Sequence, residues 1–206
     1  MESLGRNNTV IILAAGKSSR AGMPKGLIEV QGRPWIERQI ESLRRAGISK
    51  IVVVLGHHKE AYERVLRAQP GSISVVTAVN PDPDRGPFSS IQSGLQALGE
   101  DAGAAWILPV DVPCPSRSVW ESLEQEASLL ETDAALPIHL GKGGHPVRLS
   151  KDFANRLMAL SPAEPDARLD HQIHRLPSSK VSRVEVSDAK VLANLNTIDD
   201  FMRQTG

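Results

Sequence analysis

The segment from Thr9 to Gly16 constrains the fold of this chain more than any other stretch. It begins with Thr-Val-Ile-Ile-Leu, an uninterrupted apolar and β-branched run of the kind found in parallel strands covered on both faces. The run ends in Ala14-Ala15-Gly16, whose small side chains let another group approach the backbone closely. The segment therefore predicts a buried strand that leads directly into a ligand-binding loop.

Three cations follow this strand, and two familiar phosphate-binding loops can be excluded. A small-residue loop with fixed positive charge suits a phosphate-bearing ligand. A P-loop needs a glycine five positions before Gly16, where this chain has Ile11. The dinucleotide pattern G-x-G-x-x-G is absent, because the glycines of the loop are Gly16 and Gly22. The cations are Lys17, Arg20 and Lys25.

Length and charge narrow the class of protein. At 206 residues the chain is expected to form one domain, residues 1–206. Lys plus Arg and Asp plus Glu both number 24, so no net charge recruits nucleic acid or an anionic membrane. No apolar run reaches the roughly 18 to 20 residues that span a bilayer, and the first residues lack a signal-peptide core. We expect a cytoplasmic protein that binds neither nucleic acid nor membrane.

Apolar runs and helical periodicity alternate along the chain. Strands are expected at 9–13, 51–55, 73–79, 104–110 and 134–138, with a short strand at 146–149 and an alternating edge strand at 181–186. Helices are expected at 35–46, 60–68, 88–98, 116–130, 151–160, 170–176 and 197–202, and extended chain at 191–196. This βαβαβ rhythm implies an α/β fold with a mostly parallel sheet and right-handed crossovers.

The residues from Leu13 to Lys25 read L-A-A-G-x-S-x-R-x-G-x-P-K. This pattern strongly resembles the nucleotide-binding signature of nucleotidyltransferases, and it is most similar to the molybdenum cofactor cytidylyltransferase and guanylyltransferase group. The resemblance implies a Rossmann-like three-layer sandwich of the nucleotide-diphospho-sugar transferase type. It implies catalytic roles for Arg20 and Lys25, which would hold the triphosphate. It implies that the nucleotide is bound by Leu13, Ala14, Ala15, Gly16, Ser18, Arg20 and Lys25.

Asp111 follows the apolar strand 104–110, in the sequence Asp-Val-Pro. Ligands of open α/β sheets gather beyond the strand carboxyl ends, so Asp111 is expected near the first loop. A carboxylate beside phosphate oxygens is a common way of holding Mg²⁺. Asp-x-Pro also resembles the metal-binding aspartate of the same transferase group, which gives Asp111 a catalytic role and Mg²⁺ as the cofactor.

The C-terminal sequence Asn194-Leu195-Asn196-Thr197 resembles the last motif of the family. The resemblance implies Asn196 or Asn194 as a second metal ligand, through an uncharged amide oxygen. The alternative is that both residues merely cap the last helix. Asp199 and Asp200 are expected to be structural, because acidic residues in a first turn favour the helix dipole.

Two further loops carry candidate binding residues. Gly86 and Ser90 lie where the family reads the base, although serines there can simply cap a helix. Gly144-His145-Pro146-Val147 resembles an element of the cytidylyl branch near the acceptor, so His145 is expected to bind the acceptor. The alternative for His145 is an ordinary surface loop. Cys114 has no evident base partner and no assigned role.

The combined motifs imply Mg²⁺-dependent transfer of a nucleoside monophosphate from a nucleoside triphosphate to a phosphorylated acceptor. Ala15 and the Gly-His-Pro-Val element favour CTP with a molybdopterin-type acceptor, whereas Asn-x-Asn-Thr leaves GTP open. A molybdoenzyme or its chaperone would then be a partner. Two alternatives stay open: a sugar-phosphate or alditol-phosphate nucleotidyltransferase, and a protein that binds or senses nucleotides without catalysis.

Overall fold

The predicted first strand lies at the centre of the molecule. The computed structural model describes residues 9–18, 22–67, 74–99 and 103–205. Strand β1 (Thr9–Leu13) pairs in parallel with β4 (Lys50–Leu55) on one side and with β6 (Ala105–Pro109) on the other. Residues Val10, Ile11 and Ile12 have no exposed surface, as the apolar run predicts. The strand is therefore covered on both faces.

The sheet has the order β10-β7-β9-β6-β1-β4-β5, and β8 pairs with β7 outside this path. The remaining strands are β5 (Ser74–Val79), β7 (Ala134–His139), β8 (Lys142–Gly143), β9 (Val147–Leu149) and β10 (Val181–Glu185). In this sheet, β8 and β9 are antiparallel to their neighbours, and the other paired strands are parallel. Strands β2 (Glu29–Val30) and β3 (Arg33–Pro34) form a separate antiparallel pair. The prediction of a mostly parallel α/β fold is confirmed.

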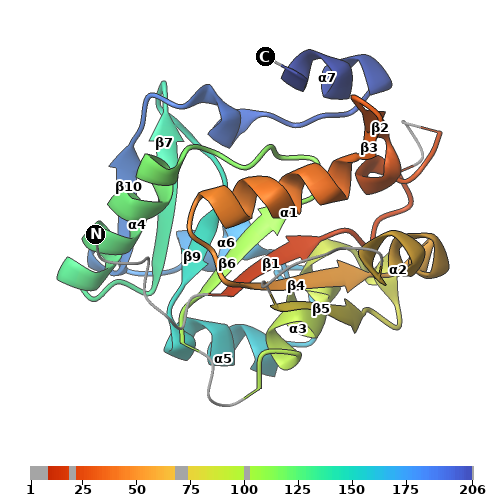
Figure 1. The fold of residues 1–206 in the computed structure, drawn as a ribbon. Coiled ribbons are helices and arrows are strands. Elements are labelled where there is room, and N and C mark those ends of the chain that lie inside the picture. Colours follow the sequence, from red (N-terminus) through yellow and green to blue (C-terminus); the bar gives the residue numbers. More distant parts are fainter. Residues whose placement is uncertain (1–8, 19–21, 68–73, 100–102, 206) are drawn as a thin grey trace.

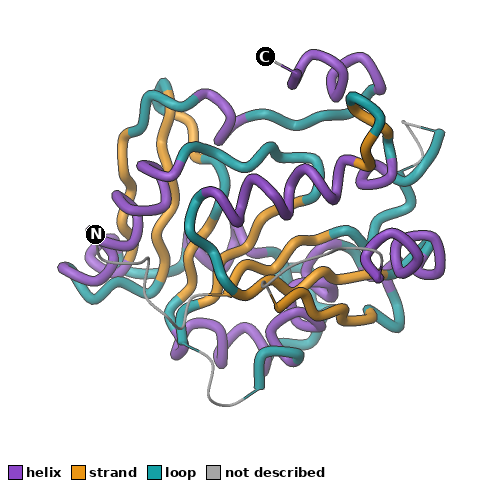
Figure 2. Tube along the Cα trace, in the orientation of Figure 1, coloured by secondary structure: helices purple, strands orange, loops and turns teal. Residues whose placement is uncertain are grey.

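Helices cover both faces of this sheet and make three layers (Figures 1 and 2). One apolar cluster joins the sheet to α1 (Trp35–Arg45), α2 (Lys59–Arg67), α4 (Arg117–Leu129) and α7 (Ile198–Met202). A second cluster on the opposite face joins it to α3 (Pro87–Gln96), α5 (Lys151–Ala159) and α6 (Leu169–His174). The sheet therefore separates two apolar cores, which together hold the strand ends in place.

The helix predictions are confirmed to within a few residues at each end. The expected last residue of the second helix, Ala68, and the expected first residue of the third strand, Ile73, lie outside the described residues. The extended chain expected at 191–196 is wrong in its first part, because a 3-10 turn spans Ala189–Leu192. Asp188 starts this turn by accepting a hydrogen bond from the backbone N–H of Lys190 at 3.1 Å.

The glycine-rich sequence at 139–145 would suit an open loop, but most of it forms a tight hairpin between β7 and β8. Leu140 and Gly141 form its turn with φ values of 50° and 76°, and two positive φ values are typical of a two-residue β-hairpin.

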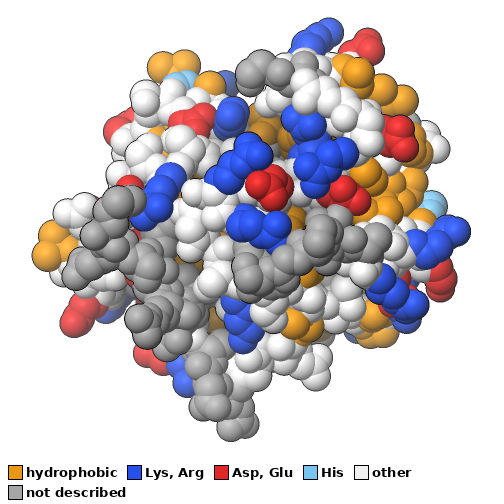
Figure 3. Space-filling model, viewed as in Figure 1, with side chains coloured by type: hydrophobic (Ala, Val, Ile, Leu, Met, Phe, Trp, Pro, Cys, Tyr) orange, Lys and Arg blue, Asp and Glu red, His pale blue; other side chains and the backbone are white. Residues whose placement is uncertain are grey.

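Figure 3 shows Lys and Arg side chains next to Asp and Glu side chains over the face that α1 covers. Among the described residues, no helix has both the length and the apolar composition needed to cross a membrane.

Candidate active site

The carboxyl ends of β1 and β6 lie side by side and bring the two main predicted motifs together. Leu13 pairs with Pro109, and the backbone N–H of Val110 donates to the Leu13 carbonyl at 3.1 Å. The chain leaves β1 toward β4 and β5 and later returns to form β6 on the other side of β1. Ligands of open α/β sheets bind at such a change of direction. Asp111 therefore stands directly beside the start of the signature loop.

The first part of the signature loop is anchored through its backbone. The Ala14 N–H donates to Val54 O at 2.9 Å, and the Ala15 carbonyl accepts from the His57 N–H at 3.1 Å. Gly56 makes this close approach feasible, because a Cβ there would lie 2.7 Å from the Ala15 carbonyl oxygen. The N–H groups of residues 15–18 donate to no other described residue. They are therefore available to an anionic ligand.

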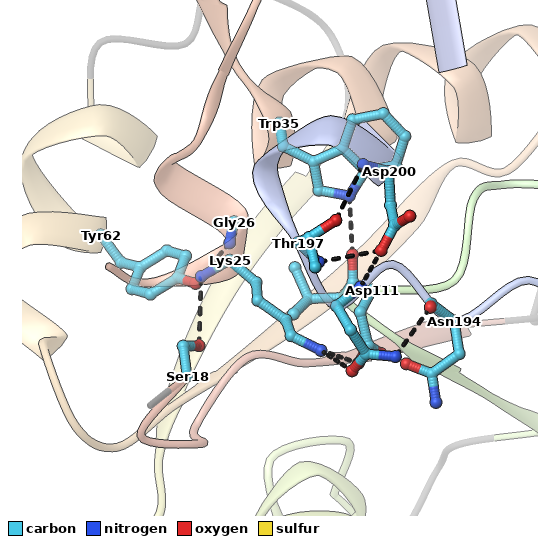
Figure 4. Close-up of polar contacts among 11 residues, drawn as sticks. Ser18, Lys25, Gly26, Trp35, Tyr62, Asp111, Asn194, Thr197 and Asp200 are labelled. Carbon is cyan, nitrogen blue, oxygen red and sulfur yellow. Dashed lines mark hydrogen bonds and ion pairs between the residues drawn. The ribbon is translucent and has the colours of Figure 1, made fainter. Parts of the chain in front are cut away.

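Lys25 is fixed by its backbone and aims its ammonium group at Asp111 (Figure 4). It begins a 3-10 turn, Lys25–Leu27, in which its N–H donates to Ser18 Oγ at 3.1 Å. The next N–H, that of Gly26, donates to the buried hydroxyl of Tyr62 at 2.9 Å. Lys25 Nζ donates to Asp111 Oδ2 at 2.7 Å and to Asn196 Oδ1 at 3.0 Å. Only 10% of the Lys25 side chain and 22% of the Asp111 side chain are exposed.

Two side chains of α1 fix the backbone on either side of Asp111. Trp35 Nε1 donates to the Val110 carbonyl at 2.7 Å. The amide of Gln39 donates to the Val112 carbonyl at 2.5 Å and accepts from the Cys114 N–H at 2.8 Å. The Asp111 carbonyl accepts from the Leu195 N–H at 2.9 Å, which joins the C-terminal motif to this loop. The backbone around Asp111 is therefore held by two separate segments of the chain, α1 and the C-terminal motif.

The C-terminal motif presents its two asparagines differently. Asn196 Oδ1 accepts from Lys25, while its Nδ2 donates to the Asn194 carbonyl at 3.0 Å. Asn194 lines a separate cavity, described below, and makes no hydrogen bond with Asp111 or Lys25 among the described residues. Thr197 and Asp200 form a capping box at the start of α7, as the structural interpretation of Asp200 predicts. The N–H groups of Thr197 and Asn196 lower the pKa of the Asp200 carboxyl.

The Asp111–Asn196 pair has the chemistry that a magnesium ion needs. A carboxylate oxygen and an amide oxygen converge on one positive charge, which the Lys25 ammonium group supplies. Mg²⁺ takes oxygen ligands and is commonly held by one or two carboxylates together with phosphates and water. In the described part of the chain, no three His, Cys, Asp or Glu side chains cluster to hold a metal. An ion at this place would therefore depend on the ligand's own oxygens as well.

A cavity of about 500 Å³, called here the smaller cavity, opens beside these groups. Its walls come from the signature loop, the start of α3 and the end of β6. Nine predicted site residues line it: Leu13, Ala14, Ala15, Gly16, Ser18, Lys25, Gly86, Ser90 and Asp111. Arg20 lies outside the described residues. The predicted nucleotide-binding residues therefore share one cavity wherever the structure describes them.

The start of α3 depends on Asn80, which by sequence alone opens a run of turn-forming residues, Asn-Pro-Asp-Pro-Asp. The buried Asn80 amide donates to Ser89 Oγ at 2.9 Å and to Ser90 Oγ at 3.0 Å. Ser89 donates to the Gly86 carbonyl at 2.8 Å, and the Gly86 N–H donates to Pro83 O at 3.2 Å. Gly86 therefore offers no free N–H for a base. Ser90 lines the smaller cavity and keeps a hydroxyl proton with no acceptor among the described residues.

A second cavity of about 900 Å³, the larger cavity, adjoins the first and shares Leu13, Pro87 and Pro109 with it. His145 lines it, as the interpretation of an acceptor-side histidine requires. The His145 N–H donates to Val191 O at 2.8 Å, so the turn at 189–192 supports this loop. His145 Nδ1 is buried and has no hydrogen-bond partner in the described chain. Burial lowers the pKa of the imidazole, so the ring is neutral near pH 7.

The shifted pKa values of two other groups, Asp84 and Cys114, follow from their surroundings. Asp84 accepts from Lys17 Nζ at 2.8 Å and from His57 Nε2 at 3.1 Å, and these neighbours lower the pKa of its carboxyl. Both Lys17 and Asp84 are more than 60% exposed, so their ion pair contributes little to stability. Burial raises the pKa of the Cys114 thiol to about 12. Cys114 is therefore a packing residue and not a nucleophile.

The comparisons with known proteins agree with this geometry. A "Probable molybdenum cofactor guanylyltransferase" of Bacillus cereus is 31% identical over 132 residues, which cover 64% of this chain and 62% of that protein. The chain thus matches less than two thirds of that relative's length. The molybdenum cofactor cytidylyltransferase of Escherichia coli is 28% identical over 202 residues, which cover 93% and 92%.

Among solved structures, a nucleotidyl transferase from Methanothermobacter has the same fold. The two superpose with a TM-score of 0.74 at 21% identity, over 97% of this chain and 96% of that one. The MobA-like NTP transferase domain matches residues 10–187, which include the signature loop, Asp111 and His145. The chain belongs to the family of MobA-like NTP transferase domains.

Proposed function

We propose that this protein transfers a nucleoside monophosphate from a nucleoside triphosphate to a phosphorylated acceptor and releases pyrophosphate, with Mg²⁺ as cofactor. The observation that carries the proposal is the contact of Lys25 with Asp111 and Asn196, because both Lys25 and Asp111 line the smaller cavity. Unpaired loop N–H groups and fixed cations suit a triphosphate. Membership of the NTP transferase family supports the same reaction.

In this mechanism a phosphate oxygen of the acceptor forms a bond to the α-phosphorus. The bond from that phosphorus to the bridging oxygen breaks, and pyrophosphate leaves with the electron pair. No general base is needed, because an acceptor phosphate is already anionic at neutral pH. Positioning and charge neutralisation supply most of the catalysis in such transfers.

The protein's own groups divide this work. The backbone N–H groups of residues 15–18 and the cations Lys25 and Arg20 hold the triphosphate, and Lys25 stabilises charge on the leaving group. Asp111 and Asn196 are the residues that would hold Mg²⁺, which when bound neutralises charge on the α-phosphate. The α1 side chains Trp35 and Gln39 keep Asp111 in place through its backbone neighbours.

CTP is the favoured donor. Ala15 belongs to the apolar cluster on the α3 side of the sheet, and it lines the smaller cavity next to Pro83 and Gly86. Compared with glycine, its methyl group takes up room in the cavity that Ser90 also lines. A narrower site favours a pyrimidine over a purine. The two relatives carry guanylyl and cytidylyl transferase names respectively, so GTP is the alternative to test.

A molybdopterin-type compound is the favoured acceptor, held in the larger cavity. Both relatives are named for the molybdenum cofactor, which supports this class. The walls of the larger cavity include the apolar side chains of Phe88, Ile91, Leu136 and Ile173. Such walls suit a flat ring system better than a polyhydroxylated sugar. Delivery of the product to a molybdoenzyme or its chaperone follows from this proposal.

The test is a screen of CTP, GTP, ATP and UTP with Mg²⁺ for acceptor-dependent pyrophosphate release. Molybdopterin is the first acceptor, and a sugar 1-phosphate and an alditol phosphate are the comparisons. We expect release with CTP and molybdopterin. Release only with a sugar or alditol phosphate would assign the acceptor to the alternative class. Nucleotide binding without release under any condition would make the chain a nucleotide-binding protein and not an enzyme.

A further inference from the structure

Lys25 stands between the two oxygen atoms that a metal would use. Its Nζ lies 2.7 Å from Asp111 Oδ2 and 3.0 Å from Asn196 Oδ1. Both oxygens therefore already have a cationic partner within the chain itself. A divalent cation bound to the same two oxygens would lie within a few ångströms of the ammonium group, where two positive charges repel strongly.

The surroundings of Lys25 strengthen this competition. The Lys25 side chain is only 10% exposed, so water screens the repulsion poorly. Its backbone is held by Ser18 and, through Gly26, by Tyr62, so the side chain alone can move. The side chain also lines the smaller cavity, as do residues 15–18, whose N–H groups donate to no other described residue. Phosphate oxygens in that cavity are the alternative partner within its reach.

We propose that Lys25 keeps the cation site closed in the nucleotide-free protein and releases it only when a triphosphate offers Lys25 new anionic partners. The divalent cation then binds together with the nucleotide and not before it. This inference rests on the proposed function for the identity of the ligand, but it concerns binding alone. When Lys25 turns to the triphosphate, the Asp111 carboxylate becomes free in the same step in which the phosphate oxygens arrive. Both then serve the ion as oxygen ligands.

The chain offers a matched control in Lys17. This residue belongs to the same loop and also makes an ion pair at 2.8 Å, but its partner is Asp84 and both side chains are more than 60% exposed. Removal of the Lys17 charge changes the net charge of the loop by the same amount without freeing Asp111. A difference in Mn²⁺ affinity between the Lys25 and Lys17 variants therefore reports on the contact of Lys25 with Asp111 and not on the overall charge of the loop.

The experiment measures Mn²⁺ binding by equilibrium dialysis, with no acceptor present and hence no turnover. The samples are the wild-type chain, Lys25→Met, Lys17→Met and the double variant Lys25→Met/Asp111→Asn, each with and without CTP. Without nucleotide, we expect Lys25→Met to bind Mn²⁺ at least about tenfold more tightly than wild type, because one repelling charge is gone. Lys17→Met should bind as wild type does, and the double variant should lose the gain.

The wild-type chain supplies a second measurement that does not depend on any variant folding correctly. We expect it to retain Mn²⁺ in the presence of CTP, or of GTP if that is the donor, and not in its absence. Tight Mn²⁺ binding by wild type without nucleotide would overturn the proposal. So would equal Mn²⁺ affinity in folded wild type and folded Lys25→Met. Failure of the proposed function would appear separately, as the lack of pyrophosphate release with every acceptor while these binding results still hold.

Discussion

At the scale of single residues, Asp111 carries the largest expected effect. Its carboxylate is the acidic group that accepts from Lys25. Its backbone is held independently, because its own carbonyl accepts from Leu195 and the carbonyls of Val110 and Val112 accept from α1 side chains. We expect Asp111→Asn to lower turnover by about a hundredfold or more, the usual effect of removing one electrostatic stabiliser. The measurement is kcat for pyrophosphate release, with circular dichroism to check the fold. Near-normal turnover would remove Asp111 from the mechanism.

Ala15 should control the choice of base. Its side chain lies on the α3 side of the sheet and lines the smaller cavity, so its removal widens the end of the cavity at Gly86 and Ser90. We expect Ala15→Gly to raise the ratio of kcat/KM for GTP to that for CTP by about tenfold, the scale of one methyl group in a pocket.

The neighbouring Ala14 is the matched control for this prediction. Ala14 belongs to the cluster on the opposite, α1 side of the sheet. Ala14→Gly should therefore leave the ratio of the two donors as it is in the wild-type chain. Equal ratios in all three proteins would show that the base is selected elsewhere.

His145 should make stability depend on pH in a defined direction. Burial lowers its pKa below the ordinary value of 6.5, so the unfolded chain takes up a proton before the folded chain does. Stability is therefore present above about pH 6.5 and is lost as the pH falls toward the pKa of the folded state. We expect wild type to lose more unfolding free energy than His145→Gln between about pH 7.5 and 5.5. Urea unfolding at the two values measures this, and equal losses would contradict the burial of the ring.

At the scale of elements, the helices act mainly by holding loops that carry the chemistry. Helix α2 supplies Tyr62, whose hydroxyl accepts from the Gly26 N–H beside Lys25. Burial raises the pKa of Tyr62 to about 12. Because this is the single tyrosine of the chain, phenolate absorbance reports on it alone.

We expect the phenolate of the folded chain to appear with a midpoint near pH 12, and near 10 in denaturant. The neutral hydroxyl is favoured by the fold, so stability is present below about pH 10 and declines as the pH rises toward 12. Tyr62→Phe should abolish the signal and leave the Gly26 N–H unpaired, at a cost of about 1–3 kcal/mol. A folded-state midpoint equal to that in denaturant would show that Tyr62 is not buried against this turn.

The elements themselves could be predicted because their signals are local. The apolar run before Ala14 predicts a strand that is covered on both faces. Asp111 follows the strand expected at 104–110, so it is expected near the first loop, where the carboxyl ends of parallel strands meet. A threonine at the start of the expected helix 197–202 predicts an N-cap there, and the capping box confirms it. These inferences need only a few consecutive residues and the known geometry of parallel sheets.

The contacts that position the site could not be predicted in this way. Gln39 bonds Val112 across 73 positions, and Tyr62 bonds Gly26 across 36, so nothing in either local sequence indicates the pairing. Asn80 looked like a turn residue, and only the packing of α3 against β5 turns its amide toward Ser89 and Ser90. The meeting of Lys25, Asp111 and Asn196 also depends on three segments that come together only in the folded chain.

At the scale of the whole molecule, two adjoining cavities open at the carboxyl ends of β1 and β6. The smaller cavity holds the fixed cations and the loop N–H groups, and the larger one lies on the α3 and α6 side. They meet at Leu13, Pro87 and Pro109, at the ends of β1 and β6 and the start of α3. A reaction that joins two substrates at one phosphorus atom suits this arrangement, because each substrate can be held by its own walls.

In the part of the chain that the structure describes, three arginines line the larger cavity and could hold the part of an acceptor that lies away from its phosphate. Arg85 pairs with Asp82 at 2.9 Å, and Arg168 pairs with Asp170 at 2.8 Å, so both already have acidic partners. Arg183 also lines this cavity, next to Leu136 in the β10–β7 register, and has no such partner among the described residues. An electron-rich group of the acceptor would find its open cation there.

We therefore expect Arg183→Gln to raise the KM for the acceptor by about tenfold, the scale of one charge-assisted hydrogen bond. The KM for the nucleoside triphosphate should stay unchanged, because Arg183 does not line the smaller cavity. Arg64→Gln is the matched control, since Arg64 is exposed on α2 and lines neither cavity. Steady-state kinetics with each substrate varied in turn separates the two constants. An equal rise in both, or no rise for the acceptor, would show that the two cavities do not divide the substrates as their walls indicate.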